Sequence, residues 1–171
     1  YAVTVTDACG LIADTTVSVP VEAGYAVNAG LDDLFCEGES LVLAATVSGL
    51  SLAIQWSTLD GVVNGSGSLA DLDVDVQGTY TITITSPLGC EYADDVFVTE
   101  APLPVVIAGD DAEICANQPY GLSASGGLSY VWTPASGLSN SAVSNPNVTL
   151  TAAATYIVEG TDFNGCSQSD T

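Results

Sequence analysis

Cysteines and acidic residues are the side chains of this sequence whose types and spacing could do chemistry. The chain has 171 residues with 21 Asp and Glu, five Cys, and no Lys, Arg or His, so its formal net charge is −21. Thiolates can hold zinc, but His ligands and C-x-x-C pairs are both absent, which favours disulfides over a zinc site. Because disulfides persist in oxidising compartments, the sequence predicts an extracellular protein, secreted or held at the cell surface.

Three aspartates alternate with apolar residues over positions 71–76. Asp71, Asp73 and Asp75 would project from one face of a strand, with successive side chains about 7 Å apart. Their carboxylate oxygens suit Ca²⁺, and no cationic side chain is present to balance them. The favoured interpretation is a solvated outer face, with the residues at 72, 74 and 76 inside. Calcium is the one candidate cofactor, and no other cofactor is expected.

The absence of cationic side chains excludes several functions. Duplex nucleic acid and anionic membrane surfaces are bound through Lys and Arg, and this chain has neither. An imidazole base, a Schiff base and the usual catalytic triad are also excluded. Carboxylate pairs can hydrolyse glycosides, but nothing in the sequence nominates one pair. No apolar run approaches the roughly 18 to 20 residues of a membrane span. We therefore expect a protein that is not an enzyme and does not insert into a membrane.

The spacing of marker residues reveals an internal repeat. In two copies, a Trp precedes a Tyr by 24 residues, and the Tyr precedes a Cys by ten. An Ala-Gly pair starts seven residues before another Cys in both copies. We call the first cysteine of each copy the early cysteine and the second the late cysteine. The repeated residues are Ala29, Gly30, Cys36, Trp56, Tyr80 and Cys90, then Ala108, Gly109, Cys115, Trp132, Tyr156 and Cys166.

The repeat divides the chain into three segments. Residues 1–22 correspond to the C-terminal two strands of a preceding repeat, because residues 1–6 and then Cys9 match residues 80–85 and then Cys90. Residues 23–102 form a complete repeat, and residues 103–171 form a second repeat that is truncated in its last strand. Prolines at the boundaries favour short, stiff linkers.

Strand patterns fill each repeat. Residues 71–76 and 81–85 alternate with period two, and residues 41–47 form an apolar run of strand length. Gly and Asn punctuate the gaps, and no helical periodicity extends over ten residues. About seven short strands in each repeat predict an all-β protein made of tandem β-sandwiches.

Aromatic residues at fixed repeat positions could serve either binding or packing. Trp56 and Trp132 could stack on sugar rings, but both lie in strand-like segments at a fixed distance from the late cysteine, which favours a core position. Tyr80 and Tyr156 recur with the same regularity, so we expect core or corner tyrosines.

Acidic pairs follow the Ala-Gly pair in each repeat. Asp32 and Asp33 in the first copy correspond to Asp110 and Asp111 in the second. Because their position recurs near the end of the preceding module, they are a second candidate site for Ca²⁺, which would stiffen the junction.

The repeat suggests a disulfide pairing. We expect Cys36 to pair with Cys90 and Cys115 to pair with Cys166, so that each disulfide clamps one sandwich. Each bridge would contribute about 4 kcal/mol to stability in the chain-entropy model. Cys9 is interpreted as a late cysteine whose partner lies outside the chain.

The second repeat resembles a known group of modules. The residues that carry this resemblance are Ile114-Cys115, Leu122-Ser123-Ala124, Tyr130-Val131-Trp132-Thr133-Pro134, Gly137-Leu138-Ser139, Pro146, Ala154-Thr155-Tyr156-Ile157-Val158 and Asn164-Gly165-Cys166. The pattern is similar to the Ig-like, PKD-like repeats of large secreted surface proteins of Bacteroidota, including gliding-motility-associated adhesins. The first complete repeat departs from it, because Trp56 is followed by no counterpart of Pro134. The resemblance implies a β-sandwich, export to the cell surface, a tandem arrangement and no catalytic residues.

These observations lead to one expected function and two alternatives. The expected function is a structural spacer array in the stalk of an extracellular adhesin or fibre, with neighbouring repeats or identical subunits as partners. The first alternative is a self-assembling filament subunit, because an isolated two-stranded hairpin such as residues 1–22 needs completing strands, which a second subunit could supply by β-strand addition. The second alternative is a module that binds calcium or surface carbohydrate.

Short glycosylation patterns are present but weak. Asn64 and Asn147 begin formal N-glycosylation sequons, and such sequons arise by chance in a chain rich in Ser and Thr. Thr15 lies in an Asp-Thr-Thr sequence that resembles the O-glycosylation signal of Bacteroidota.

Overall fold

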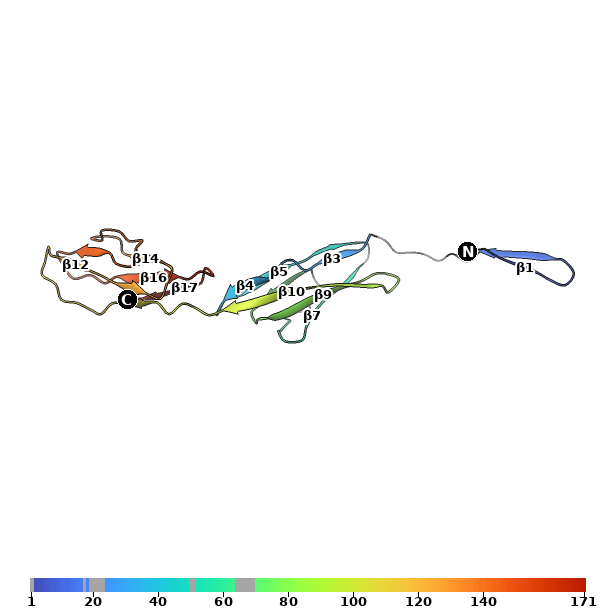
Figure 1. The fold of residues 1–171 in the computed structure, drawn as a ribbon, viewed down its shortest axis with the longest axis horizontal. Helices are drawn as coiled ribbons and strands as arrows, with labels where there is room; N and C mark the ends of the chain where they lie inside the picture. Colours follow the sequence, from blue (N-terminus) through green and yellow to red (C-terminus); the bar gives the residue numbers. More distant parts are fainter. Residues whose placement is uncertain (1, 17, 19–23, 50–51, 64–69) are drawn as a thin grey trace.

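The computed structural model describes residues 2–16, 18, 24–49, 52–63 and 70–171. All regular structure in these residues is β-strand. None of the described residues forms a helix long and apolar enough to cross a membrane. The strands form a hairpin and two sandwich modules, and the two modules lie end to end along the long axis (Figure 1).

The N-terminal hairpin consists of β1 (Ala2–Thr6) and β2 (Ile12–Thr16), paired antiparallel. Every residue of β1 is exposed, including Val3 and Val5. The hairpin lies apart from both modules in Figure 1. It therefore contributes no buried core of its own among the side chains that the structure describes.

The first module is a sandwich with a central four-stranded sheet in the order β4-β10-β9-β7. Two-stranded sheets β3-β6 and β5-β8 complete it, and side chains from both sides share one core. Its strands are β3 (Ala26–Asn28), β4 (Asp33–Cys36), β5 (Leu41–Ala44), β6 (Thr46–Ser48), β7 (Ala53–Thr58), β8 (Asp71–Val74), β9 (Gly78–Thr85) and β10 (Glu91–Ala101).

Period-two alternation in the sequence explains the core of the first module. In β9, Tyr80, Ile82 and Ile84 are fully buried, and the threonines between them are partly exposed. Trp56 lies opposite Ile82 across the β7–β9 ladder and is 1% exposed. Burial of these large side chains supplies the main stabilisation, because the free energy gain scales with the apolar area removed from water.

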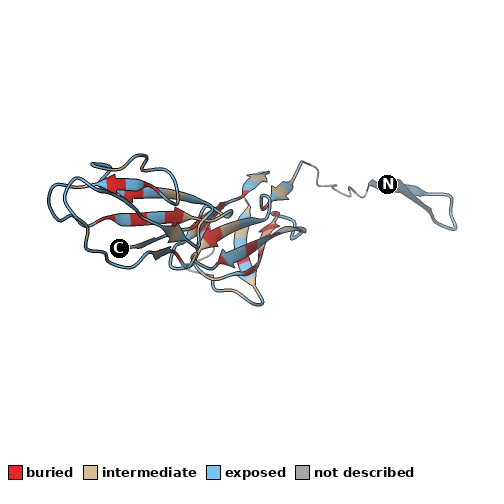
Figure 2. Ribbon diagram, turned by 60° about the vertical axis from the view of Figure 1, so that its left-hand side comes forward, coloured by how far each residue is buried: buried red, intermediate tan, exposed pale blue. Residues whose placement is uncertain are grey.

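The second module repeats the arrangement with shorter strands. Sheet β14-β16-β17 corresponds to β7-β9-β10, and sheets β12-β15 and β11-β13 correspond to β5-β8 and β3-β6. Trp132, Tyr156 and Val158 form its core with Val106 and Val148. Figure 2 shows the buried parts of its strands in red. Its strands are β11 (Ile107–Ala108), β12 (Pro119–Gly121), β13 (Ala124–Ser125), β14 (Ser129–Thr133), β15 (Asn147–Thr149), β16 (Ile157–Thr161) and β17 (Ser167–Asp170).

One parallel pairing fixes the position of an early cysteine. Strand β4 pairs parallel with the last residues of β10, so that Cys36 lies beside Ala101. The other described strand pairs are antiparallel. As a result, Cys36 lies at the end of the first module that adjoins the second module.

Candidate functional site

A turn between the last two strands of the second module presents Cys166. Asp162 Oδ1 accepts hydrogen bonds from the backbone N–H groups of Asn164 (2.8 Å) and Cys166 (2.9 Å). Gly165 adopts a φ of 89°, in the left-handed region that glycine enters without strain. The backbone N–H of Asp162 donates to the carbonyl of Cys166 at 2.9 Å and closes the turn. The side chain of Cys166 is thereby held at the tip of the β16–β17 hairpin.

A second turn positions Cys36 at the end of β4. The backbone N–H of Glu37 donates to the carbonyl of Ala101 at 2.8 Å, and the N–H of Glu39 donates to the carbonyl of Cys36 at 2.9 Å. The first bond ties the turn to the end of β10, and the second closes the turn itself. Cys36 is thus held where the chain leaves the first module.

Cys36 and Cys166 form a disulfide between the two modules. Their Cα atoms are 5.5 Å apart, within the usual range for disulfides, and the two residues are 130 positions apart in the sequence. Cys166 is 1% exposed, so this sulfur is buried at the junction. The bond joins the last hairpin of the second module directly to the end of the first module.

The expected pairs Cys36–Cys90 and Cys115–Cys166 do not form, and the geometry of the first module explains why. Cys90 precedes the start of β10, whereas Cys36 lies beside Ala101 at the end of the same strand. At about 3.3 Å per residue, the 11 positions from 90 to 101 span about 36 Å. A disulfide requires Cα atoms within about 7 Å. The early and late cysteines of one module therefore lie at opposite ends of it.

The three other cysteines, Cys9, Cys90 and Cys115, are exposed and form no disulfide in the structure. Cys9 was expected to match Cys90, but it lies two positions earlier in its turn. Gly10 and Gly89 occupy the same left-handed position, with φ of 80° and 85°, and Cys9 precedes its glycine whereas Cys90 follows its own. Cys9 therefore corresponds in position to Leu88.

A recurring carboxylate ties the last strand of each module to its first strand. Asp94 Oδ2 accepts a hydrogen bond from the backbone N–H of Ala29 at 2.9 Å, and Asp170 Oδ2 accepts one from Ala108 at 2.8 Å. Hydrogen bonds from the backbone N–H of Ala108 and, to a lesser extent, from that of Thr171 stabilise the ionised carboxylate of Asp170. They hold the pKa of Asp170 below its usual value. The sequence interpretation missed this contact, although both aspartates lie four residues after the late cysteine.

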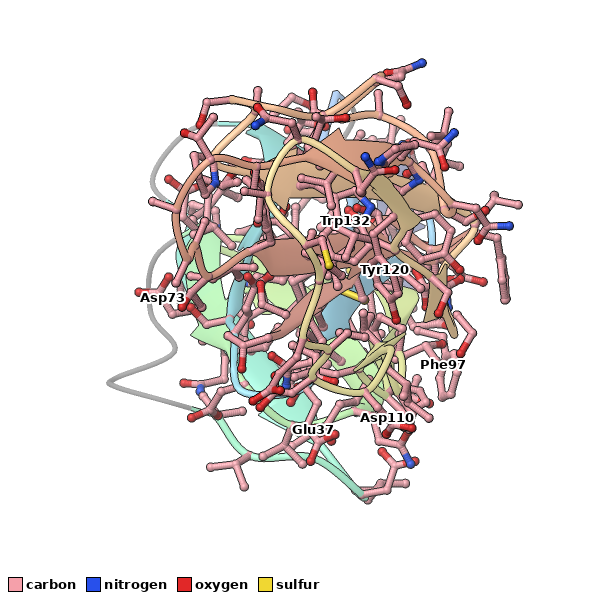
Figure 3. The ribbon with its side chains drawn as sticks, turned by 90° about the vertical axis from the view of Figure 1, so that its left-hand side faces the viewer. Glu37, Asp73, Phe97, Asp110, Tyr120 and Trp132 are labelled. Carbon is pink, nitrogen blue, oxygen red and sulfur yellow. A yellow bond between two sulfur atoms is a disulfide. The ribbon has the colours of Figure 1, made fainter. Side chains whose placement is uncertain are left out.

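The candidate calcium residues are separate in the structure. Asp71, Asp73 and Asp75 are exposed along and after β8, while Leu72 and Val74 point into the core. Figure 3 shows Asp73 and Asp110 on different sides of the molecule. Among the described residues, no three acidic or cysteine side chains come together as a metal site would require. Calcium binding at any of these positions remains a prediction.

The acidic pairs near the repeat starts have individual roles. Asp32 Oδ1 accepts a hydrogen bond from the backbone N–H of Phe97 at 2.9 Å, and Asp33 Oδ1 accepts one from Leu34 at 2.8 Å. Asp110 and Asp111 are exposed. In the first module, therefore, these carboxylates accept hydrogen bonds from backbone N–H groups. Such bonds stabilise a negative charge in a chain that has no cationic side chains to pair with it.

The recurring aromatic residues are buried. Trp132 is 3% exposed, and its Nε1 donates to the carbonyl of Val143 at 2.9 Å (Figure 3 labels Trp132). Tyr80 Oη donates to the carbonyl of Val76 at 2.6 Å, and burial raises the pKa of Tyr80. Tyr156 Oη donates to the carbonyl of Ser136 at 2.5 Å. Like Trp56, Trp132 is therefore not available to stack on a sugar.

The candidate glycosylation residues are only partly described. Asn147 is exposed in β15. Asn64 and the side chain of Thr15 lie outside the described residues.

The second module carries a groove where the first module is filled. The groove has a volume of about 1170 Å³, and Leu122, Trp132, Val148 and Tyr156 are among its lining residues. In the first module, β10 continues seven residues beyond Asp94 and buries Val96, Val98 and Ala101. In the second module, β17 ends at Asp170, which corresponds to Asp94, and Thr171 lines the groove.

The architecture is that of Ig-like β-sandwich modules. No protein-family model and no curated protein matches the sequence. Among solved structures, the insect immune protein hemolin matches with a TM-score of 0.44 and 13% identity, over 99% of this chain and 54% of hemolin. The complex of Dpr2 Ig1-Ig2 with DIP-Theta Ig1-Ig3 matches with a TM-score of 0.40 and 11% identity, over 86% of this chain and 63% of that chain.

A bacterial structure is also similar. The SGBP-B protein of the Bacteroides ovatus mixed-linkage glucan utilization locus, in complex with a heptasaccharide, matches with a TM-score of 0.34 and 16% identity, over 81% of this chain and 40% of that chain. This chain thus covers less than two thirds of each of these three proteins. At such scores and identities, the similarities carry no conclusion about function.

Proposed function

We propose that this chain is part of an extracellular structural array, in which Ig-like modules joined end to end act as a spacer in the stalk of a surface adhesin or fibre. The observation that carries the proposal is the Cys36–Cys166 disulfide, which bonds consecutive modules to each other. A disulfide inside a module would stabilise that module alone. A disulfide between modules also restrains how one module moves relative to the next, and this is the property that a spacer needs.

The charge of the chain supports the same function. With 21 acidic and no basic residues, neighbouring modules repel each other, which favours an extended and soluble array. The sequence has no Lys or His for a Schiff base or a catalytic triad, and both Trp side chains are buried. These observations point away from these enzyme mechanisms and from sugar stacking at the Trp residues. Adhesive specificity would then lie in another part of the parent protein, and Bacteroidota remain the proposed source group.

Small-angle X-ray scattering tests the spacer function. We expect the oxidised chain to show one narrow distribution of distances between the two modules, and reduction should broaden that distribution. The Cys36→Ala/Cys166→Ala double variant should resemble the reduced chain, whereas the control Cys90→Ala/Cys115→Ala should behave as the oxidised protein. An oxidised chain as flexible as the double variant would contradict a spacer role.

A second candidate function is a filament subunit joined by strand addition, and the observation that favours it is the exposed β1–β2 hairpin, which lies apart from both modules. A completing strand would present apolar side chains at alternate positions, as Val96 and Val98 do in the first module. By the hairpin register, sequence positions 17 and 19, both Val, correspond to 96 and 98. A second copy could thus donate residues 17–22, which lie almost wholly outside the described part.

Sedimentation velocity distinguishes the filament from the spacer. A strand-donating subunit should form larger species as concentration rises, and deletion of residues 1–22 should abolish them. If the full chain stays monomeric at all concentrations, the filament alternative is wrong and the spacer function is unaffected.

A further inference from the structure

Cys90 occupies the same structural position as the bonded Cys166. Each residue follows a glycine in the left-handed region, Gly89 with a φ of 85° and Gly165 with a φ of 89°. The backbone N–H of Ser86 donates to the carbonyl of Cys90 at 2.9 Å, which is the distance of the equivalent bond to Cys166. Ser86 Oγ accepts from the Cys90 N–H at 3.0 Å, just as the carboxylate of Asp162 accepts from Cys166 at 2.9 Å. The late cysteines of both modules are therefore presented in the same way.

Cys115 occupies the same structural position as the bonded Cys36. The backbone N–H of Gln118 donates to the carbonyl of Cys115 at 3.1 Å, and the equivalent bond in the first module, to Cys36, measures 2.9 Å. Two residues after each early cysteine the backbone is left-handed, at Asn117 with a φ of 63° and at Gly38 with a φ of 83°. Asn is one of the few residues other than Gly that adopts this conformation readily. Both modules thus form the same turn at the early cysteine.

The unpaired cysteines lie at the two outer ends of the pair of modules. In the first module, Cys36 and Cys90 are separated by the length of β10, about 36 Å, and the repeat assigns Cys115 and Cys166 the corresponding positions in the second module. Because Cys36 and Cys166 meet at the junction, Cys90 lies at the far end of the first module and Cys115 at the far end of the second. Both are exposed. Neither can reach a cysteine of its own module without unfolding it.

We propose that Cys90 and Cys115 are the two halves of further inter-module disulfides of the same kind as Cys36–Cys166. Cys90 would bond the early cysteine of a module that precedes the first module. Cys115 would bond the late cysteine of a module that follows the second. The partner in both cases is another module of this repeat type, so the inference rests on the proposed array. Each module would then be bonded to both of its neighbours.

The chemistry of each bond is an ordinary thiol oxidation. Two cysteine thiols lose two protons and two electrons and form one S–S bond, while a disulfide oxidant, such as oxidised glutathione or a dithiol oxidoreductase, is reduced to two thiols. Cys9 is not assigned to this set, because it lies two positions earlier in its turn than Cys90 does. The structural equivalence to a bonded pair, and not the presence of a thiol alone, carries the assignment.

The test is a chain with one additional module. Because Asp170 and Thr171 take the repeat positions of Asp94 and Asp95, a second copy of residues 96–171 can follow Thr171 directly and continue the strand in register. Ser167→Ala in the added copy labels its late cysteine by mass, and Cys115→Ala in the added copy removes a second early cysteine whose peptide would be identical to that of the original Cys115. The protein is oxidised with a glutathione redox buffer, free thiols are alkylated, and the chain is cleaved at Asp and Glu, because trypsin has no site in it. Mass spectrometry then identifies the disulfide-linked peptides.

We expect Cys36 joined to the original Cys166, and Cys115 joined to the Cys166 of the added copy. Alkylation of Cys115 should fall from nearly complete in the 171-residue chain to nearly absent in the extended chain. Cys166→Ala in the added copy should restore that alkylation and leave the Cys36 bond intact. The inference is wrong if Cys115 stays alkylated in the extended chain, or if it bonds the original Cys166.

The same experiment separates the inference from the proposed function. If the Cys36–Cys166 bond also fails to form, the disulfide between the two modules is wrong, and the inference that is based on it is wrong as well. If both expected disulfides form but small-angle X-ray scattering still shows a broad distribution of distances between the modules, the spacer function is contradicted. The assignment of Cys90 and Cys115 to inter-module disulfides is then unaffected.

Discussion

Mechanical stretching of the chain by its two ends should depend strongly on the inter-module disulfide. In the oxidised protein, the covalent path from the N-terminus runs to Cys36, across the S–S bond to Cys166, and on to Thr171. The residues between the two cysteines then lie outside the path that carries the force. Unfolding either module cannot extend the molecule by the length of that segment.

The length of chain enclosed between the two bonded cysteines follows from their sequence positions. Residues 37–165 comprise 129 residues, since 165 − 37 + 1 = 129. At a maximum of about 3.6 Å per residue, they hold about 46 nm of chain. Stretching in the presence of reductant should release this length as the two modules unfold, whereas the oxidised chain should release only the residues outside positions 36–166.

The assay is single-molecule stretching with handles attached through peptide tags at both termini, so that no cysteine is used for attachment. The Cys36→Ala/Cys166→Ala double variant should release the full length without reductant. The Cys90→Ala/Cys115→Ala variant should match the unmodified chain. Release of about 46 nm from the oxidised chain, before any bond is reduced, would refute the reasoning.

Further predictions concern the acidic residues. Asp94→Ala removes the acceptor for the Ala29 N–H and should lower the free energy of unfolding by about 1 kcal/mol, whereas the exposed neighbour Asp95, changed to Ala as a control, should have little effect in urea denaturation. Because the pKa of Asp170 is lowered in the folded state, its contribution to stability should be present above its unfolded pKa and lost as the pH falls through the folded value. The difference in stability between the unmodified chain and Asp170→Asn should therefore shrink from pH 7 to acid, and a constant difference would argue against the charged bond. Millimolar Ca²⁺ should raise the melting temperature more than NaCl of matched ionic strength, and equal shifts would reduce the effect to screening.

The sequence predicted the all-β fold because its signals are local. Alternation over residues 81–85 and the Trp-to-Tyr spacing are properties of single strands and of neighbouring strands, and the structure places Trp56 directly opposite Ile82 on β9. The disulfide pairing was wrong for a reason that local patterns do not contain. The parallel pairing of β4 with the end of β10 decides at which end of the module Cys36 lies, and that pairing joins residues more than 60 positions apart.

The carboxylate contacts were missed for a related reason. Asp94 and Asp170 recur four residues after the late cysteine, so the repeat did contain a signal. In a chain with 21 acidic residues, however, recurrence of an Asp carries little weight until its backbone partner is known. The partner N–H groups at Ala29 and Ala108 lie 65 and 62 positions away.

The charge of the chain gives a physical reason for placing the disulfide between modules. Each sandwich has a core built on a buried Trp and Tyr. Without Lys, Arg or His, no side-chain ion pair can join one module to the next, and two modules of the same sign repel each other. A covalent bond is insensitive to that repulsion and to salt. The acidic residues can then keep the array extended while the disulfide keeps consecutive modules in contact.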